Sequence, residues 1–148
     1  MLTIAGAILQ HSFRIMTFRH DGRGLPAERG GAMYLLMTLF VVSRLLRDVV
    51  DPDGFNALVT MLTCGAFLGM MSLFTRPTPM AILLLAMLMG NLATGLLTLA
   101  GFKGTFINAG IIGWELIAMS VTLSRLVDRA KADHKKKKHS EKHPDEEK

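Results

Sequence analysis

Residues 55–74 read FNALVTMLTCGAFLGMMSLF, and residues 80–102 read MAILLLAMLMGNLATGLLTLAGF. Neither stretch contains Asp, Glu, Lys or Arg. Each reaches the length of about 20 apolar residues that an α-helix needs to cross the hydrocarbon of a bilayer. Only TRPTP lies between them, and its prolines end one helix and start the next. The two stretches therefore predict two membrane-spanning helices joined by a tight loop.

The distribution of charge supports a membrane location. Charged residues make up 20% of the chain, yet between Gly54 and Ser124 only Arg76, Lys103 and Glu115 are charged. A soluble domain would need many more polar side chains to cover this segment, and a disordered chain would contain far fewer apolar ones. This pattern excludes both classes and favours a small integral membrane protein.

Two further spans complete the expected arrangement. Residues 31–50 form the first expected span, which is the least apolar of the four because Arg44, Arg47 and Asp48 enter its second half. The last span covers about residues 107–127. Short loops make each helix antiparallel to the next. The predicted fold is therefore an all-α integral membrane protein, an up-and-down four-helix transmembrane bundle within residues 30–128, with spans at about 31–50, 55–74, 80–102 and 107–127.

The two ends differ from the bundle. Residues 1–29 predict an amphipathic helix and a glycine-rich linker, and the helix either lies in the headgroup region or packs against the bundle. Residues 129–148 are rich in Lys, His and Glu, which predicts a disordered tail. The tail is expected to attract anionic lipid headgroups through four consecutive lysines, which are Lys135, Lys136, Lys137 and Lys138.

Charge and cysteine content restrict compartment and partners. The formal net charge is +5, but most of the excess lies at the two ends, which favours an excess of juxtamembrane cations rather than nucleic-acid binding. The positive-inside rule then predicts that both termini are cytoplasmic, in a membrane such as the bacterial inner membrane. The single cysteine, Cys64, allows no intrachain disulfide and no thiolate metal cage.

A set of polar residues interrupts the spans at similar depth. At about 1.5 Å rise per residue, these polar residues lie roughly 9 to 17 Å along their helices. The distance is measured from the helix ends that face the first and third interhelical loops. Ionisable groups at that depth need partners. One interpretation is an Arg44–Glu115 ion pair bridged by Asn91; the alternative is that Arg44 extends to the headgroups and pairs with Asp48, while Glu115 bonds a neighbouring helix. The predicted intramembrane polar layer consists of Arg44, Thr63, Cys64, Asn91 and Glu115.

Small residues four apart allow helices to approach closely in lipid, either within one chain or between chains. The predicted packing residues are Gly65, Gly69, Ala86, Gly90, Ala109 and Gly113.

No enzyme motif, metal-ligand set or cofactor motif is recognisable, and His11 and His20 are expected to be isolated outside the bundle. The function expected first is non-enzymatic: a membrane subunit or assembly factor that acts through helix contacts with other subunits or with itself. Two alternatives remain open, a holin-type pore former with a charged tail and a small ion-coupled carrier that uses Glu115.

Overall fold

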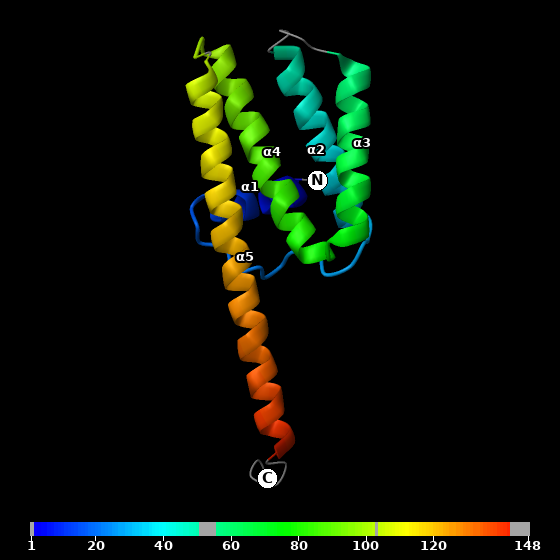
Figure 1. Ribbon diagram of the computed structural model, residues 1–148, viewed down its shortest axis with the longest axis vertical. Helices are drawn as coiled ribbons and strands as arrows, with labels where there is room; N and C mark the ends of the chain where they lie inside the picture. The colour runs from blue at the N-terminus through cyan, green and yellow to red at the C-terminus, as the bar shows by residue number, and fades with distance from the viewer. Residues whose placement is uncertain (1, 51–55, 103, 143–148) are drawn as a thin grey trace.

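The computed structural model describes residues 2–50, 56–102 and 104–142, and helices account for most of them (Figure 1). The predicted turn at 51–54, Lys103, the side chains of 135–138 and the last six residues lie outside this description. No β-strand occurs in the described ranges. The five helices are α1 (Leu2–Met16), α2 (Gly31–Val50), α3 (Ala57–Phe74), α4 (Pro77–Leu99) and α5 (Thr105–Lys142).

Helix α4 is the centre of the molecule. It packs against α1, α2, α3 and α5, and eleven of its residues are buried. This position follows from its composition, because a helix that is apolar on every side is stable when other helices surround it. Proline at its first turn starts the helix, and Gly101, with a φ of +87°, follows its end. The apolar stretch predicted at 80–102 is therefore helical from Pro77 to Leu99.

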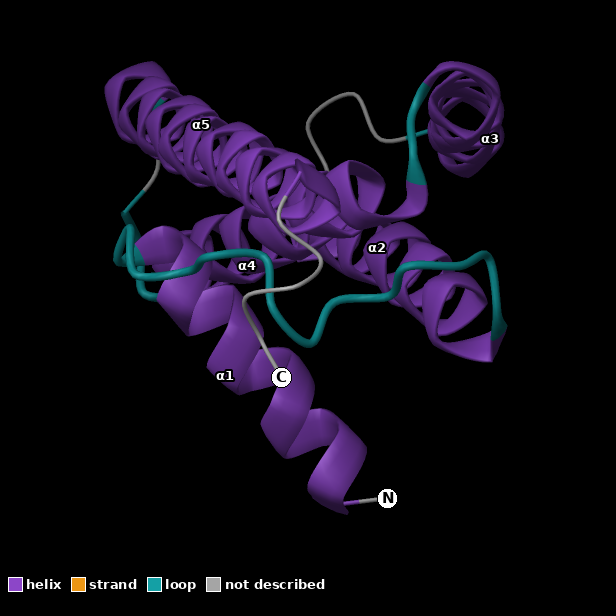
Figure 2. Ribbon diagram, turned by 90° about the horizontal axis from the view of Figure 1, so that it is seen from below, coloured by secondary structure: helices purple, strands orange, loops and turns teal. Residues whose placement is uncertain are grey.

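The remaining long helices run alternately up and down around α4 (Figure 1). Helix α2 packs along α4, and α5 packs on another side of it. Helix α3 contacts α2 and, less extensively, α4. Among the described residues it makes no contact with α5, and α3 stands at the edge of the group when seen from below (Figure 2). The four helices therefore leave an opening between α3 and α5.

Three helices are long and apolar enough to cross a membrane: α3, α4 and the part of α5 from Phe106 to His134. This confirms an all-helical fold, within the described residues, that has three helices apolar enough to span a membrane. Helix α2 has the predicted bounds but is not among the three, because every 18-residue stretch of it contains Arg44, Arg47 and Asp48. Its role as a fourth span stays a prediction.

The tail predicted to be disordered is helical as far as Lys142. Once the membrane part of α5 has formed, each further residue adds a backbone hydrogen bond without a new nucleation cost. Ala130, Ala132 and the lysines that follow favour a helix, and Arg129 pairs with Asp133 one turn away, at 3.9 Å. The prediction of disorder was wrong for residues 129–142.

Helix α1 lies beside α4 and α5 and is steeply inclined to them rather than parallel (Figures 1 and 2). Ser12 and Ile15 are fully buried, and the helix contacts α4 and α5. Leu9 and Phe13 on another face are 57% and 63% exposed. One face thus packs on the bundle, and a second apolar face is free to meet the headgroup region.

The linker from α1 to α2 passes beneath the helix ends (Figure 2) and is attached there. A guanidinium nitrogen of Arg29 donates to the carbonyl oxygens of Ser72 and Thr75, at the end of α3. The Thr78 hydroxyl donates to the Pro26 carbonyl oxygen at 3.2 Å. These bonds hold the linker against the turn between α3 and α4.

Candidate functional site

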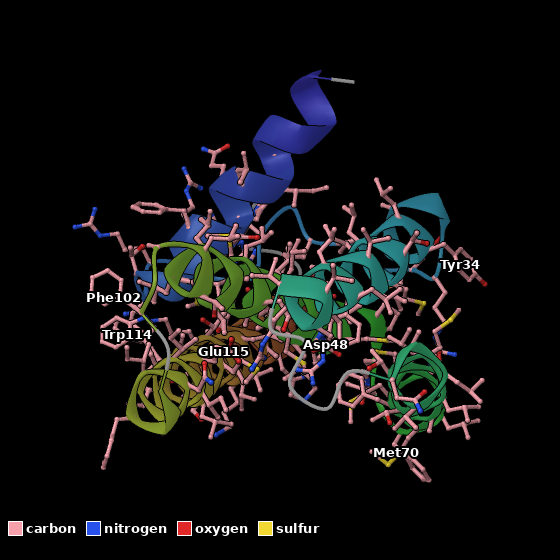
Figure 3. The ribbon with its side chains drawn as sticks, turned by 90° about the horizontal axis from the view of Figure 1, so that it is seen from above. Tyr34, Asp48, Met70, Phe102, Trp114 and Glu115 are labelled. Carbon is pink, nitrogen blue, oxygen red and sulfur yellow. The ribbon has the colours of Figure 1, made fainter. Side chains whose placement is uncertain are left out.

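A cavity of about 790 Å³ lies among α2, α3, α4 and α5. Both α3 and α5 line it, and among the described residues their backbones do not approach closely, so the cavity lies between these two helices. Asp48 and Glu115 lie on the inner side of the helices, whereas Tyr34, Met70 and Phe102 lie at the periphery (Figure 3). All five residues of the predicted polar layer line this cavity: Arg44, Thr63, Cys64, Asn91 and Glu115.

Arg44 does not pair with Glu115 in the structure. Its Nε lies 3.4 Å from the Asp48 carboxylate, one turn further along α2. The predicted ion pair between α2 and α5 was therefore wrong, and the alternative partner is the one observed. The physical reason is proximity, because side chains four residues apart on a helix are neighbours whatever the tertiary packing. The Asp48 carboxylate also accepts a hydrogen bond from the Thr60 hydroxyl at 2.8 Å, which joins α2 to α3.

Arg47 makes the connection that was expected from Arg44. Its Nη1 donates to Asn91 Oδ1 at 3.4 Å, and its charge acts on Glu115 across the cavity. Asn91 Nδ2 in turn donates to Ser43 Oγ at 3.2 Å, and Ser43 donates to the Phe40 carbonyl oxygen. Asn91 therefore bridges α2 and α4. The sequence pattern placed Arg47 near a helix end and gave no indication of this contact.

Glu115 lies directly against the backbone of α4. A Cβ atom added to Gly90 would lie 1.1 Å from Glu115 Oε1. Gly90 was predicted to allow close helix packing, and the group that approaches it is a carboxylate side chain. Glycine at this position makes room for the carboxyl group within the α4–α5 contact.

The other predicted packing residues lie either in the interior or on the surface. Ala86 is fully buried on α4. Gly65 and Gly69 on α3 and Gly113 on α5 would place a Cβ atom in open space, and Ala109 is exposed. Of the predicted packing residues, only Ala86 and Gly90 face a neighbouring helix of the same chain. Contacts of the others with another chain stay a prediction.

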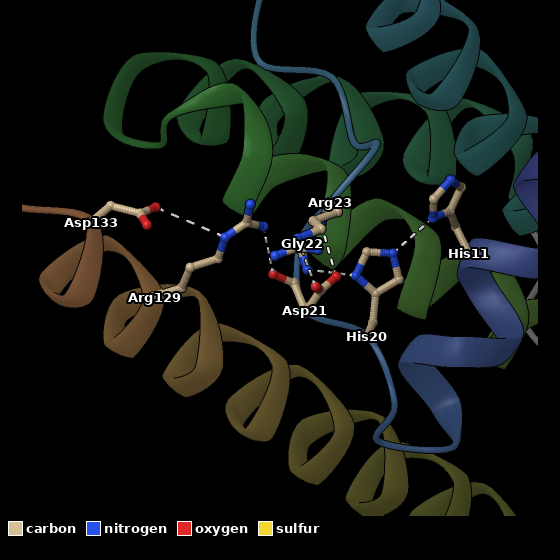
Figure 4. A network of polar contacts seen from close by, with 7 residues as sticks. All are labelled: His11, His20, Asp21, Gly22, Arg23, Arg129 and Asp133. Carbon is tan, nitrogen blue, oxygen red and sulfur yellow. Dashed lines mark hydrogen bonds and ion pairs between the residues drawn. The ribbon is translucent and has the colours of Figure 1, made fainter. Parts of the chain in front are cut away.

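A second polar cluster was missed by the sequence analysis. His11 Nδ1 and His20 Nε2 lie 2.7 Å apart (Figure 4). The Gly22 N–H donates to His20 Nδ1 at 2.8 Å, so the neutral His20 ring carries its proton on Nε2 and donates it to His11. The two histidines were expected to be isolated outside the bundle, but one lies on α1 and the other lies next to it in the linker. The turn after α1, with Phe18 at a φ of +57°, brings them together.

This cluster fastens the linker to α5. Arg129 donates to the Asp21 carbonyl oxygen at 3.5 Å, and Arg125 donates to the Phe18 carbonyl oxygen. Trp114 donates from Nε1 to the Met16 carbonyl oxygen at 3.0 Å, and its ring lies 4.8 Å from that of Phe18. Gly22 packs so closely on α5 that an added Cβ would lie 2.7 Å from the Leu126 side chain.

Burial lowers the pKa of His20 below its ordinary value, and the neighbouring charges of His11 and Arg14 lower it further, against a smaller opposing effect of Asp21. Burial, followed by the charge of Arg14, also lowers the pKa of His11. The lowered pKa values favour the neutral form of both rings, in which His20 can donate to His11.

Within the described ranges, no group of three or more His, Cys, Asp or Glu side chains is placed to hold a metal ion. The chain matches no known protein-family model, and no curated protein or solved structure is significantly similar to it.

Replacing Gly90 by Ala is expected to destabilise the protein, because the new methyl group displaces the Glu115 carboxyl group. The loss expected is about 1–3 kcal/mol, as for other overpacked sites. Gly95→Ala is the matched control on the same helix, since an added Cβ there has no neighbour within 4 Å. Thermal unfolding in lipid nanodiscs measures the stability of both variants. The double variant G90A/E115A should be no less stable than E115A, and an equal loss in both backgrounds would contradict the steric explanation.

Acidification is expected to loosen the linker from α5. The lowered pKa values mean that the detached state binds protons more readily, so the contact is fully stable above about pH 6.5 and weakens as the pH falls below it. Trp114 is the sole tryptophan, so its fluorescence reports the contact directly. The change in Trp114 fluorescence on acidification should be smaller in His20→Asn, which keeps an acceptor for the Gly22 N–H. A change of the same size in that variant would show that groups other than the histidines cause it.

Proposed function

We propose that this is a four-span integral membrane protein that acts non-enzymatically, through helix contacts with other copies of itself or with other membrane subunits. The observation that supports this function best is the position of α3. The helix carries no charge from Ala57 to Phe74, and Cys64 is its one buried residue. Its remaining surface is available to lipid or to another helix.

One side of α3 is suited to close helix contact. At 100° per residue, Gly65 and Gly69 lie on the side of the helix opposite Thr63 and Phe67, which line the cavity. Leu58 and Leu62 flank the glycines and are 68% and 64% exposed. We call Leu58, Leu62, Gly65 and Gly69 the outer face of α3. A GxxxG pair beside large apolar side chains is the pattern that lets two membrane helices bring their backbones together.

Helix α2 is proposed as the fourth span. Its charged residues have partners inside the protein: Arg44 with Asp48, and Arg47 with Asn91. Such partners lower the cost of ionisable groups in a membrane segment. The end of the molecule that carries Arg14, Arg19, Arg23 and the basic part of α5 is then proposed to be cytoplasmic, with Leu9 and Phe13 of α1 in the headgroup region.

Leucine at Gly65 and Gly69 is expected to abolish association while leaving the fold intact, because these positions contact nothing within the chain. The mass of the complex in nanodiscs excised directly from native membranes is the measurement. The wild-type protein should be heavier than one chain, and G65L/G69L should be monomeric. Ala66→Leu introduces one leucine beside the outer face, on the exposed surface of the same helix, and is the control. A monomeric wild-type protein would refute the proposal.

A second candidate function, an ion-coupled carrier, is favoured by the cavity. Glu115, Arg47 and Asn91 line it together, and a carboxyl group beside an arginine within a membrane segment is a common arrangement in proton pathways. The holin-type alternative has no comparable observation in its favour and stays a prediction from the sequence.

Glu115→Gln tests the carrier. In proteoliposomes under an imposed pH gradient, the wild-type protein should dissipate the gradient faster than the variant does, as a pH-sensitive dye reports. Glu28→Gln is the control, because Glu28 is exposed in the linker. Identical accumulation and identical flux of wild type and E115Q would remove Glu115 from any transport mechanism.

A further inference from the structure

The lining of the cavity changes from polar to apolar along the helix axes. The polar side chains lie towards the end of α2 and the start of α3, where Asp48 and Thr60 meet. Further from that end the lining is apolar on every helix, with Phe67, Met71, Leu83, Met87 and Met119. The cavity therefore has a polar end and an apolar end.

Its length matches one leaflet of a bilayer. Asp48 lies two residues before the end of α2, and Leu83 lies sixteen residues before the end of α4, which runs in the same direction as α2 (Figure 1). At about 1.5 Å per residue, the lining spans roughly 20 Å along the axes. Half of the hydrocarbon core is about 15 Å thick. A molecule that follows this lining would have its polar group near the membrane surface and its apolar part near the midplane.

The absence of contact between α3 and α5 gives such a molecule a lateral entry. Both helices border the cavity, and neither touches the other among the described residues. An opening on this side faces the lipid when α3 and α5 span the membrane. A ligand already dissolved in the bilayer would enter sideways, without passing through water.

The polar end offers groups of both signs. Arg44, Arg47 and Asp48 line it, and the Glu115 carboxyl group lies deeper on the same lining. Guanidinium groups bind phosphate, and carboxylates attract cationic groups. The polar end is therefore complementary to a head group that carries both signs.

We propose that the cavity binds a single-chain zwitterionic amphiphile of the lysophospholipid type. Its phosphate contacts the arginines, its cationic group lies beside Asp48, and its chain extends past Glu115 between α3, α4 and α5 towards Met87. A volume of about 790 Å³ falls within the range of about 300–1,000 Å³ typical of sites for one small ligand. The proposal is independent of the outer face of α3 and goes beyond helix association.

The test uses the full chain in nanodiscs and a lysophosphatidylcholine probe with a photoreactive diazirine in its chain. Mass spectrometry of the digested protein locates the adducts. Saturable labelling is expected on cavity-lining segments of α3, α4 and α5, and unlabelled lysophosphatidylcholine should compete. Met87→Trp fills the apolar end and is expected to reduce the saturable labelling about tenfold. Leu62→Trp adds a tryptophan to the outer face and should leave it unchanged.

Three results would overturn the proposal. Labelling that never saturates would show that there is no defined site. Equal saturable labelling in Met87→Trp and the wild type would place the site elsewhere. Full competition by glycerophosphocholine, which has no chain, would show that the chain is not bound. Stronger competition by a single-chain fatty acid would replace the zwitterionic ligand with an anionic one. If Met87→Trp does not accumulate, Met119→Phe is used in its place. It narrows the same part of the cavity and is likewise expected to reduce the saturable labelling.

Discussion

The carboxylate of Glu115 sets the constraint on which the arrangement of the long helices depends. A carboxyl group in the middle of an apolar helix is costly unless other groups compensate for the lost water. Gly90 provides the space on α4, and Arg47 on α2 provides the opposite charge. These partners come from two different helices, so α5, α4 and α2 must pack in one register. Asn91, bonded to both Arg47 and Ser43, fixes that register on the α2 side.

Helix α3 is not subject to the same constraint. It is joined to the other helices mainly through α2, with the Thr60–Asp48 hydrogen bond as its polar link. Its apolar surface is stable in lipid without protein neighbours. The packing of α2, α4 and α5 therefore does not depend on α3. The outer face of α3 lies on the side of the helix opposite the cavity, so the proposed partner and the proposed ligand would contact opposite sides of the same helix.

The positions of the spans were predictable from the sequence because apolar length and missing charge are local properties. The stretches 55–74 and 80–102 fall on α3 and α4 with small shifts at their ends, which capping by Asn56 and the proline at the start of α4 explain. The polar layer could also be located, since depth along a helix follows from residue number. Its pairing could not, because whether Arg44 or Arg47 meets α4 depends on helix rotation. His11 and His20 were missed for a related reason: their contact depends on a backbone turn at Phe18 that no residue pattern indicates.

The attachment of the linker to α5 has a consequence for the order of biogenesis. The bond from Arg125 to the Phe18 carbonyl oxygen joins residues 107 positions apart. Helix α1 precedes α4 and α5 in the chain, so it is synthesised before the two helices that bury Ser12 and Ile15. Its packing surface therefore stays uncovered until α5 has been synthesised. The headgroup region is an environment in which an amphipathic helix is stable during that interval. A helix that is made before its packing partners thus reaches its final position after them.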